Sequence, residues 1–322
     1  MGEFELIERF FAKSAKRPDV VLGIGDDAAL ITPPENHQLV VTTDTLVEGI
    51  HFFADIPANA LGHKSLAVNL SDLAAMGAEP RWATLAITLP SARMAWMEQF
   101  CEGFFELAEY YNVTLVGGDT TRGPLSLTIT AHGVVPMGQA LTRSHGQVGD
   151  WVYVTGLLGG SALGLKHLQG LQKLTNEQRD TLLNLHYYPQ PRVLSGYGLR
   201  GVASSCIDIS DGLLADLGHI AKSSGCSAKI QVEQLPIHPV VKSLCSPEEA
   251  IALALCGGED YELCFSVPEE NKGALEVALS YSGVHYHCIG QLVAGDEPVS
   301  LYQGKEDYHL GGAYSWDHFR SS

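Results

Sequence analysis

Apolar residues recur at helical spacing in several stretches of the first part of the chain. In residues 3–13 the apolar side chains share one side, which predicts an amphipathic helix. The same period predicts helices over residues 58–76 and 95–110, and Gly77 is expected to cap the end of the first of these. Short apolar runs predict strands over residues 38–43, 82–89, 113–116 and 125–135. Helices and strands therefore alternate here.

The pattern restarts after Pro136-Met137-Gly138, which is the candidate domain boundary. Beyond it, strands are expected over residues 151–155, 205–210 and 261–267, and a helix over 211–223. We therefore predict an α/β fold of the α+β type, with an N-terminal domain over residues 1–137 and a C-terminal domain over residues 138–322.

Composition narrows the class of protein. The 322 residues include 20 basic and 37 acidic side chains, for a net charge of −17, and 45% are hydrophobic. The hydrophobic content excludes a disordered chain, and the negative charge argues against a nucleic-acid partner. No apolar run approaches the ~18–20 residues of a membrane span, and the first residues lack the pattern of a signal peptide. Seven cysteines without a C-x-x-C pair fit a cytoplasmic protein.

Five carboxylate motifs share one form, an aspartate beside glycine or hydroxyl residues at the expected end of a strand or start of a helix. They are Gly25-Asp26-Asp27, Thr42-Thr43-Asp44-Thr45, Asn69-Leu70-Ser71-Asp72, Gly117-Gly118-Asp119-Thr120-Thr121 and Asp208-Ile209-Ser210-Asp211-Gly212. Any one of them alone is more often a turn or a helix cap. Together, carboxylate and hydroxyl oxygens suit a hard cation such as Mg²⁺.

Asp72 adds a further indication of a cation. It is expected near the C-terminal end of its helix, where the helix dipole disfavours an anion and a bound cation would offset that effect. A solvated aspartate is the alternative. The P-loop, G-x-G-x-x-G, EF-hand, H-E-x-x-H and G-x-S-x-G patterns are absent, so the common nucleotide and hydrolase motifs do not identify the chemistry.

The ordered set of motifs resembles the thiamine-monophosphate kinase family, within the aminoimidazole-ribonucleotide-synthetase-like (PurM-like) superfamily. Besides the five motifs above, the resemblance rests on Gly49-Ile50-His51-Phe52 and Gly257-Gly258-Glu259-Asp260-Tyr261-Glu262-Leu263, and it runs from Glu3 to Phe319. It implies a two-domain PurM-like fold whose N-terminal sheet pairs with a second subunit in a homodimer. It also implies direct in-line transfer of the ATP γ-phosphate to thiamine monophosphate, giving thiamine diphosphate and ADP, with several Mg²⁺ ions.

The resemblance also assigns roles to residues. The positions that match magnesium ligands are Asp27, Thr42, Thr43, Asp44, Asp72, Asp119, Asp208 and Asp211. Nucleotide contacts match Gly118, Asp119, Arg143 and Ser210, and positions at the thiamine-phosphate site match His51, Glu259 and Trp316. From these matches we expect Asp44, Asp72 and Asp119 to converge on a shared Mg²⁺.

Each of the less specific positions has a plainer interpretation. His51 fits a structural histidine, Glu259 a tight turn, Trp316 a core residue and Arg143 a surface residue. Backbone N–H groups of residues 156–161 could wrap a phosphate, although a tight strand-to-helix turn is the preferred interpretation. No catalytic general base is expected, because the second pKa of a phosphate monoester is about 6 and the acceptor oxygen is already mostly ionised near pH 7.

Two alternative functions remain open at this point. A selenophosphate-synthetase-like enzyme of the same superfamily is one, but residues 1–30 lack the reactive cysteine that it would need. A non-catalytic acidic protein that binds divalent cations is the other. It explains the charge and the aspartates, but it gives Arg143, His51 and Trp316 no role.

Overall fold

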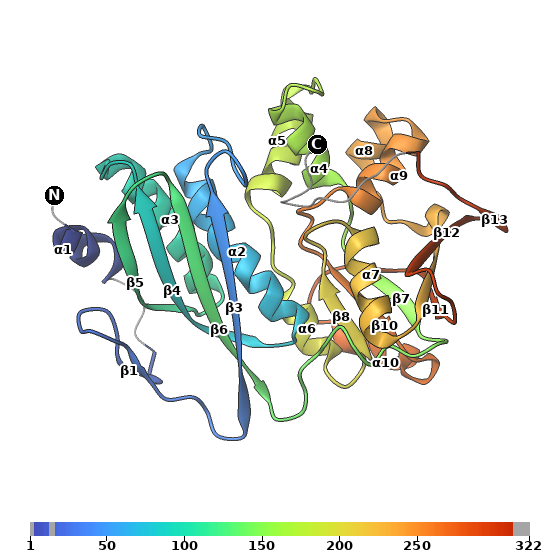
Figure 1. Cartoon of the computed structure of the whole chain (residues 1–322), viewed down its shortest axis with the longest axis horizontal. Helices are drawn as coiled ribbons and strands as arrows, with labels where there is room; N and C mark the ends of the chain where they lie inside the picture. The colour runs from blue at the N-terminus through green and yellow to red at the C-terminus, as the bar shows by residue number, and fades with distance from the viewer. Residues whose placement is uncertain (1–2, 13–16, 312–322) are drawn as a thin grey trace. The chain divides into compact units, whose positions relative to one another are not determined.

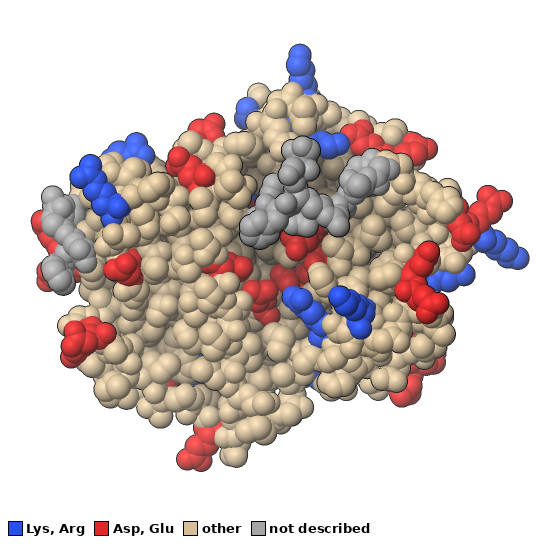
Figure 2. All heavy atoms as spheres, in the orientation of Figure 1, with Lys and Arg blue, Asp and Glu red and all other residues tan. Residues whose placement is uncertain are grey.

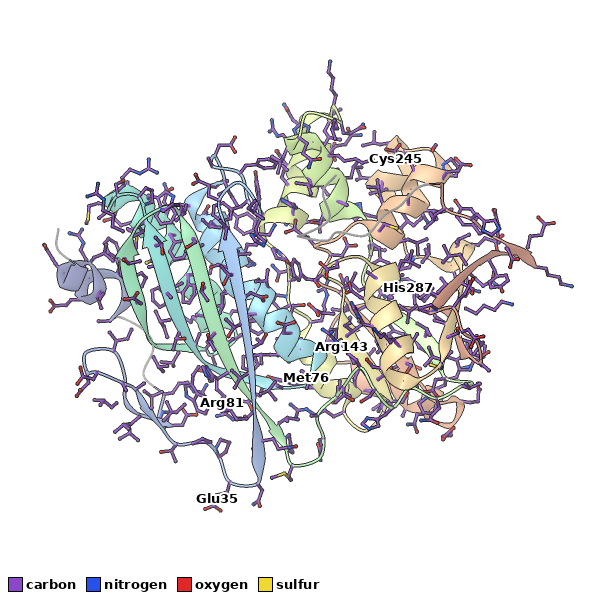
Figure 3. All side chains as sticks on the ribbon, in the orientation of Figure 1. Glu35, Met76, Arg81, Arg143, Cys245 and His287 are labelled. Carbon is purple, nitrogen blue, oxygen red and sulfur yellow. The ribbon has the colours of Figure 1, made fainter. Side chains whose placement is uncertain are left out.

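The computed structural model describes residues 3–12 and 17–311, and they form two compact units. The first comprises residues up to 73 together with 78–140, and the second comprises 74–77 together with 141 onward. The predicted boundary after residue 137 lies close to this division. The short segment 74–77 belongs with the second unit because Leu141 N–H donates to Met76 O (3.1 Å) and Arg200 Nε donates to Gly77 O (2.5 Å). Met76 is labelled in Figure 3.

The N-terminal unit is built on a four-stranded sheet in the order β3-β6-β4-β5 (Figure 1). The neighbours β3 and β6, and β6 and β4, are antiparallel, whereas β4 and β5 are parallel. Its elements in chain order are α1 (Glu3–Leu6), the π-helical turn η1 (Ile7–Phe11), β1 (Val20–Leu22), β2 (Leu30–Ile31), β3 (His37–Val47), α2 (Ala58–Ala75), β4 (Glu79–Leu89), α3 (Met94–Tyr110), β5 (Thr114–Arg122) and β6 (Ser126–Pro136).

Helices α2 and α3 contact each other through glycine. A Cβ on Gly62 of α2 would lie 2.0 Å from Phe100 O, and a Cβ on Gly103 of α3 would lie 1.9 Å from Asn59 O. The two backbones therefore approach more closely than any larger residue would allow. Both helices lie along one face of the sheet in Figure 1, and the core contains fully buried side chains such as Phe100 and Phe104.

The other face of the sheet is rich in threonine and is largely uncovered by the described residues. Strand β3 alternates, so that Leu39, Val41, Thr43 and Thr45 are exposed while the intervening side chains are more buried. Leu39 and Val41 are 48% and 53% exposed, which is unusual for apolar residues on a long strand. Only the end of this face near β1 and β2 is packed, by a cluster around Trp82.

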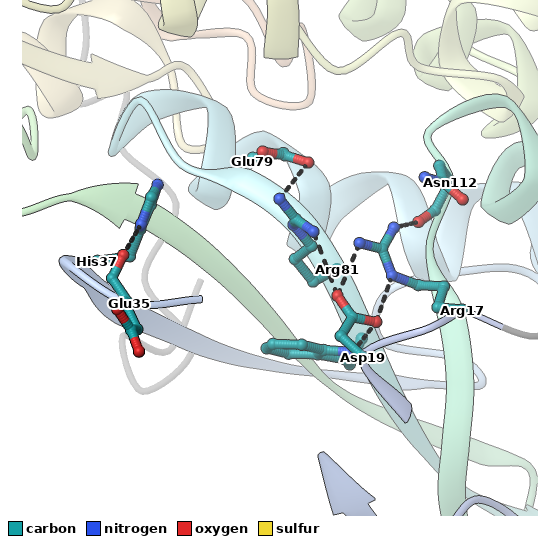
Figure 4. Close-up of polar contacts among 8 residues, drawn as sticks. Arg17, Asp19, Glu35, His37, Glu79, Arg81 and Asn112 are labelled. Carbon is teal, nitrogen blue, oxygen red and sulfur yellow. Dashed lines mark hydrogen bonds and ion pairs between the residues drawn. The ribbon is translucent and has the colours of Figure 1, made fainter. Parts of the chain in front are cut away.

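An arginine cluster fixes the segment that precedes β1 (Figure 4). The Asp19 carboxylate accepts two hydrogen bonds from Arg17 (both 2.9 Å) and one each from Arg81 (3.2 Å) and Trp82 Nε1 (3.3 Å). Arg17 also donates to Asn112 O at 2.6 Å. Burial acts to raise the pKa of Asp19, but the arginine contacts outweigh it and the pKa is lowered. The cluster thereby ties this segment to β4 and to the α3–β5 connection.

The second unit contains a seven-stranded sheet in the order β13-β12-β9-β11-β7-β10-β8, antiparallel except between β12 and β9. Its elements are β7 (Trp151–Thr155), α4 (Gly160–Leu168), α5 (Asn176–Tyr187), α6 (Val193–Leu199), β8 (Ser205–Asp208), α7 (Leu213–Ser224), β9 (Ser227–Gln231), η2 (Val232–Gln234), α8 (Pro239–Leu244), α9 (Pro247–Cys256), β10 (Leu263–Val267), η3 (Glu269–Asn271), α10 (Lys272–Leu279), β11 (Tyr286–Val293), β12 (Val299–Gln303) and β13 (Glu306–Asp307). Strand β10 lies between β7 and the edge strand β8 and pairs with both, so the loop that leads into β10 lies beside the end of β8.

Two predicted strands are longer than expected, and this changes the setting of their aspartates. Strand β5 continues through Gly117-Gly118-Asp119 to Arg122, because residues 117–122 pair in parallel with residues 84–89 of β4 after a bulge. Strand β3 likewise continues past Asp44 to Val47. The expectation that Asp44 and Asp119 follow the ends of strands is therefore wrong. By contrast, α2 ends at Ala75 and Gly77 has a φ of 63°, as expected for a helix cap.

The surface charge and the hydropathy of the helices agree with the acidic, moderately hydrophobic composition. Figure 2 shows acidic side chains spread over the visible face, with basic side chains between them. None of the helices in the described ranges is long and apolar enough to span a bilayer.

Candidate functional site

In the N-terminal unit, strand β3 and the last turn of α2 bring Thr42 and Asp72 together. Thr42 Oγ1 donates to Asp72 Oδ2 at 2.5 Å. Asp72 lies three residues before the last residue of α2, Ala75, and therefore near the C-terminal end of the helix, as expected. A hydroxyl oxygen and a carboxylate thus lie next to each other at the end of the helix whose dipole disfavours the negative charge.

Asp44 lies on the same side of β3 as Thr42, because side chains two residues apart share a face of a strand. Its main-chain N–H donates to Asn69 Oδ1 at 3.2 Å, which ties this part of β3 to the buried side of α2. Burial, together with the nearby charge of Asp72, raises the pKa of Asp44 to about 6. Asp44 and Asp72 are therefore two mutually repelling carboxylates, and a divalent cation would offset their charge.

The Thr43 side chain lies on the opposite face of the sheet. Its Oγ1 donates to Thr130 Oγ1 at 2.9 Å on the exposed, threonine-rich side. The main chain of Thr43 lies between Thr42 and Asp44, but its side chain lies on the other face of the sheet within the same chain. A role for Thr43 as a metal ligand stays a prediction.

The expected convergence of Asp44, Asp72 and Asp119 does not occur within one chain. Asp44 is on β3 and Asp119 is on β5, which are the two edge strands of the sheet, with β6 and β4 between them. Three inter-strand spacings amount to about 14 Å, whereas a single Mg²⁺ binds its ligands at about 2 Å. The motif spacing along the chain gave no information on strand order, so a site shared by all three aspartates stays a prediction that one chain by itself does not supply.

Gly118 is required by the packing of β5 on β4. Its φ is 152°, and a Cβ there would lie 1.9 Å from Leu85 O. Gly118 and the following Asp119 are both exposed. A nucleotide contact at Gly118 stays a prediction.

Asp27 and His51 lie in turns of the N-terminal unit. Asp27 is exposed between β1 and β2, and its N–H donates to Asp26 Oδ1 at 2.8 Å. His51 follows β3, and its Nδ1 accepts a hydrogen bond from Val47 N–H at 3.0 Å. Because Nδ1 is the acceptor, the neutral His51 ring carries its proton on Nε2.

In the second unit, the structure brings two motifs that are about 50 residues apart into direct contact. Asp208 ends β8 and pairs with Leu263 of β10. Beyond the strand, Tyr261 N–H donates to Ile209 O (2.8 Å) and Glu259 N–H donates to Ser210 O (2.7 Å). The loop that carries Glu259 is thereby fixed on the loop that carries Ser210 and Asp211.

Asp216 of α7 fixes the main chain of the loop between β8 and α7 through hydrogen bonds. Its Oδ2 accepts hydrogen bonds from both Ser210 N–H and Asp211 N–H at 3.1 Å. Burial, with the charge of Asp211 as a second cause, raises the pKa of Asp216 to about 7, although the N–H groups and the charge of Arg143 act in the opposite direction. Arg143, labelled in Figure 3, is exposed and close enough to this loop for its charge to act there.

The turn between β7 and α4 binds a carboxylate of the chain itself. Gly159 N–H donates to both oxygens of Asp260, at 3.1 and 3.0 Å. Burial raises the pKa of Asp260, and hydrogen bonds from Gly159 and Ser161 N–H act to lower it. These N–H groups at the start of α4 are therefore already occupied, as expected for a structural turn and not for a phosphate-binding loop.

Several residues that support the motifs of the two units received no role from the sequence. They are Asn69 and Asp216, which support the motif loops, and Ser161, His186, Arg192 and Glu262, which lie around the loop that carries Glu259. Asp216 had a readable signal, since it lies in the first turn of the helix that follows the motif. The others contact residues 70 or more positions away, apart from Asn69 and Ser161. Trp316 lies outside the described residues.

The oxygen donors of Thr42, Asp44 and Asp72 fit a Mg²⁺ ion that is only partly coordinated by protein, and not a metal ion whose ligands all come from the protein. Within residues 3–12 and 17–311, no group of three or more His, Cys, Asp or Glu side chains is arranged to hold a metal ion. Mg²⁺ is usually bound by one or two carboxylates, with water and substrate phosphates completing the shell. The Thr42–Asp72–Asp44 arrangement supplies that kind of partial oxygen site.

Comparisons with known proteins relate nearly the whole chain to one family. Family models for AIR synthase related proteins match residues 25–135 (N-terminal domain) and 147–303 (C-terminal domain). The thiamine-monophosphate kinase of Escherichia coli K12 is 52% identical over 320 residues, covering 99% of this chain and 98% of that protein.

Two solved structures are similar to this chain in both fold and sequence. The thiamine-monophosphate kinase of Stenotrophomonas maltophilia K279a is 45% identical with a TM-score of 0.86, over 94% of this chain and 96% of that one. AaThiL complexed with AMPPCP and TMP is 30% identical with a TM-score of 0.77, over 92% of each chain. The chain therefore belongs to the thiamine-monophosphate kinase family, within the AIR synthase related proteins.

Proposed function

We propose that this protein is a thiamine-monophosphate kinase, which transfers the γ-phosphate of ATP to thiamine monophosphate and releases thiamine diphosphate and ADP. The observation that carries the proposal is the similarity over essentially the full length to proteins of that activity. A structural relative that binds AMPPCP and TMP agrees with ATP and thiamine monophosphate as the substrates. The selenophosphate-synthetase-like alternative and the cation-binding alternative lack a comparable observation.

Magnesium is the proposed metal. Several ions are proposed, and each unit is considered by itself. The candidate ligands in the N-terminal unit are Thr42, Asp44 and Asp72, with Asp27, Thr43 and Asp119 as further candidates, and those in the second unit are Asp208 and Asp211. When bound, Mg²⁺ neutralises phosphate oxygens and stabilises the charge that develops during phosphoryl transfer. Asn69 and Asp216 would keep the ligand-bearing segments in place through their main-chain hydrogen bonds.

The transfer needs no general base from the protein. An oxygen of the acceptor phosphate is mostly ionised near pH 7 and can form a bond to the γ-phosphorus while the bond from that phosphorus to the β,γ-bridging oxygen breaks. The task of the chain is then to bind and align two anions. Arg143, Ser210 and Gly118 are proposed for the nucleotide, and His51, Glu259 and Trp316 for thiamine monophosphate.

The purified protein with Mg-ATP is expected to form thiamine diphosphate and ADP in equal amounts, and only when thiamine monophosphate is present. Chiral γ-phosphate should be transferred with inversion, because a single in-line displacement inverts configuration. ATP turnover that is independent of thiamine monophosphate would favour another enzyme of the superfamily, and no turnover at all would favour the cation-binding alternative. Net retention, or labelled protein after incubation with ATP alone, would indicate a phosphoenzyme.

We also propose a homodimer in which the uncovered face and edge of the N-terminal sheet meet a second copy of the chain. Strand β3 is an edge strand of 11 residues, and its exposed side carries Leu39 and Val41. Long edges with apolar side chains are normally protected, and a two-fold dimer, the commonest assembly of soluble chains, would cover this one. A cytoplasmic location is proposed from the seven cysteines, which are all free.

Sedimentation at micromolar concentration is expected to give twice the chain mass of 34.6 kDa. Val41→Lys should shift the protein towards the monomer, because it places a charge in the proposed interface. Val277→Lys is the matched control, since Val277 is 72% exposed on α10 in the second unit. A wild-type monomer with full activity would refute the dimer.

A further inference from the structure

The carboxylate of Glu259 is fixed by a buried histidine from another helix. His186 lies in the last turn of α5 and its side chain is 5% exposed. Its Nδ1 is 3.1 Å from Glu259 Oε2 and 3.0 Å from Ser161 Oγ, which is in the first turn of α4. The contact joins three segments, α4, α5 and the loop before β10.

The chemistry of the two partners determines the proton on His186. An ionised carboxylate only accepts hydrogen bonds, so Nδ1 at 3.1 Å from Glu259 must carry a proton. A ring with a bare Nδ1 would place two acceptors against each other in a buried setting. The hydroxyl of Ser161 then acts as a second acceptor for the same N–H.

The main chain of Glu259 is also fixed. Its φ is 66°, in the left-handed region that residues other than glycine seldom adopt, and its N–H is held by Ser210 O at 2.7 Å. A Cβ on the preceding Gly258 would lie 2.5 Å from the same Ser210 O, so only glycine allows the two loops to approach this closely. Strained residues that the surroundings hold in place occur preferentially at functional sites.

The Glu259 side chain nevertheless remains 26% exposed. A carboxylate that is held by main chain and side chain and still reaches solvent is suited to recognise a cation. Thiamine carries a permanent positive charge on its thiazolium ring, which distinguishes it from ATP. The same carboxylate would repel an anionic phosphate, so its contact is with the ring part of the substrate.

We propose that His186 is a positioning residue that, together with Ser161, orients the Glu259 carboxylate toward the cationic ring of thiamine monophosphate. This inference rests on the proposed function and adds to it a residue that sets substrate affinity without touching the substrate. Its effect is confined to the KM for thiamine monophosphate, because Glu259 binds that substrate alike in the ground and transition states.

The first test compares three variants of the whole protein. His186→Leu should raise the KM for thiamine monophosphate about 10-fold, with kcat and the KM for ATP nearly unchanged. His186→Asn should recover most of the affinity, because its amide can place an N–H near the position of Nδ1. His167→Leu is the matched control, since His167 on α4 bonds Gln172 O (2.9 Å) and not the Glu259 loop. Equal effects of His186→Leu on both substrates, or of both leucine variants, would overturn the proposal.

The second test does not depend on activity or on a variant that folds. Nitrogen-15 NMR of the wild-type protein should show the proton of His186 on Nδ1, and a bare Nδ1 would overturn the proposed contact. A wild-type protein that does not phosphorylate thiamine monophosphate, but has the proton on Nδ1, would contradict the proposed function and leave the contact itself established.

Discussion

Asp72→Asn is expected to lower kcat/KM by about 100-fold or more at limiting Mg²⁺, because it removes the negative charge from one side of the partial oxygen site. The fold should survive, since an asparagine oxygen can still accept the hydrogen bond that Thr42 Oγ1 donates to this position at 2.5 Å. Circular dichroism and thermal unfolding would check the fold, and turnover would be measured over a range of Mg²⁺ concentrations.

The design of this experiment separates a metal-binding role from a general effect of charge. Asp55→Asn is the matched control, because Asp55 is exposed in the loop before α2 and has no assigned role. The loss cannot come from protonation of Asp44, since removing the charge of Asp72 removes one of the two causes that raise its pKa to about 6. Activity of Asp72→Asn equal to that of wild type at limiting Mg²⁺ would exclude Asp72 as a ligand.

The part of the site that the sequence predicted well is the part set by local structure. The apolar period and Gly77 correctly placed the end of α2, and with it Asp72 in the last turn. Membership of the kinase family followed from short motifs in a fixed order, and the full-length comparison confirmed it. Both signals are local in the chain, so neither needs knowledge of which strands are neighbours.

What depended on pairing between distant strands was predicted poorly. The glycines at 117 and 118 suggested the end of a strand, yet the parallel partner β4 extends β5 to Arg122. Asp119 then lies on the edge strand opposite that of Asp44, and a shared ion within one chain is excluded by the strand order. Thr42 and Thr43, by contrast, lie on opposite faces of β3, and the alternation of side chains already implies this for the predicted strand over residues 38–43.

The supporting side chains show a second limit. His186 and Arg192 reach Glu259 and Glu262 across 73 and 70 positions, and nothing in the local sequence distinguishes them from surface residues. Their role arises from burial, because a buried carboxylate needs a donor and the fold decides which donor is near. Arg192 is the case with the largest consequence for stability.

Arg192→Met is expected to destabilise the second unit by about 3–5 kcal/mol, because it leaves the Glu262 carboxylate buried without its cationic partner. The Glu262 side chain is 5% exposed and that of Arg192 is 23% exposed. Arg192 donates from Nε to Glu262 Oε2 (2.6 Å) and from its second guanidinium nitrogen to Oε1, while Thr155 Oγ1 donates to Oε2 (2.6 Å). Urea-induced unfolding followed by circular dichroism would measure the loss.

The controls distinguish a buried ion pair from an arginine that is merely well packed. Arg179→Met breaks the exposed pair with Asp180 on α5 and should cost only about 0–1 kcal/mol. Arg192→Met combined with Glu262→Gln should recover part of the loss, because no charge is then left uncompensated. The Arg192–Glu262 pair would be shown not to stabilise the second unit by either of two results. One is a loss of unfolding free energy no larger than that of Arg179→Met, and the other is a loss that Glu262→Gln does not reduce.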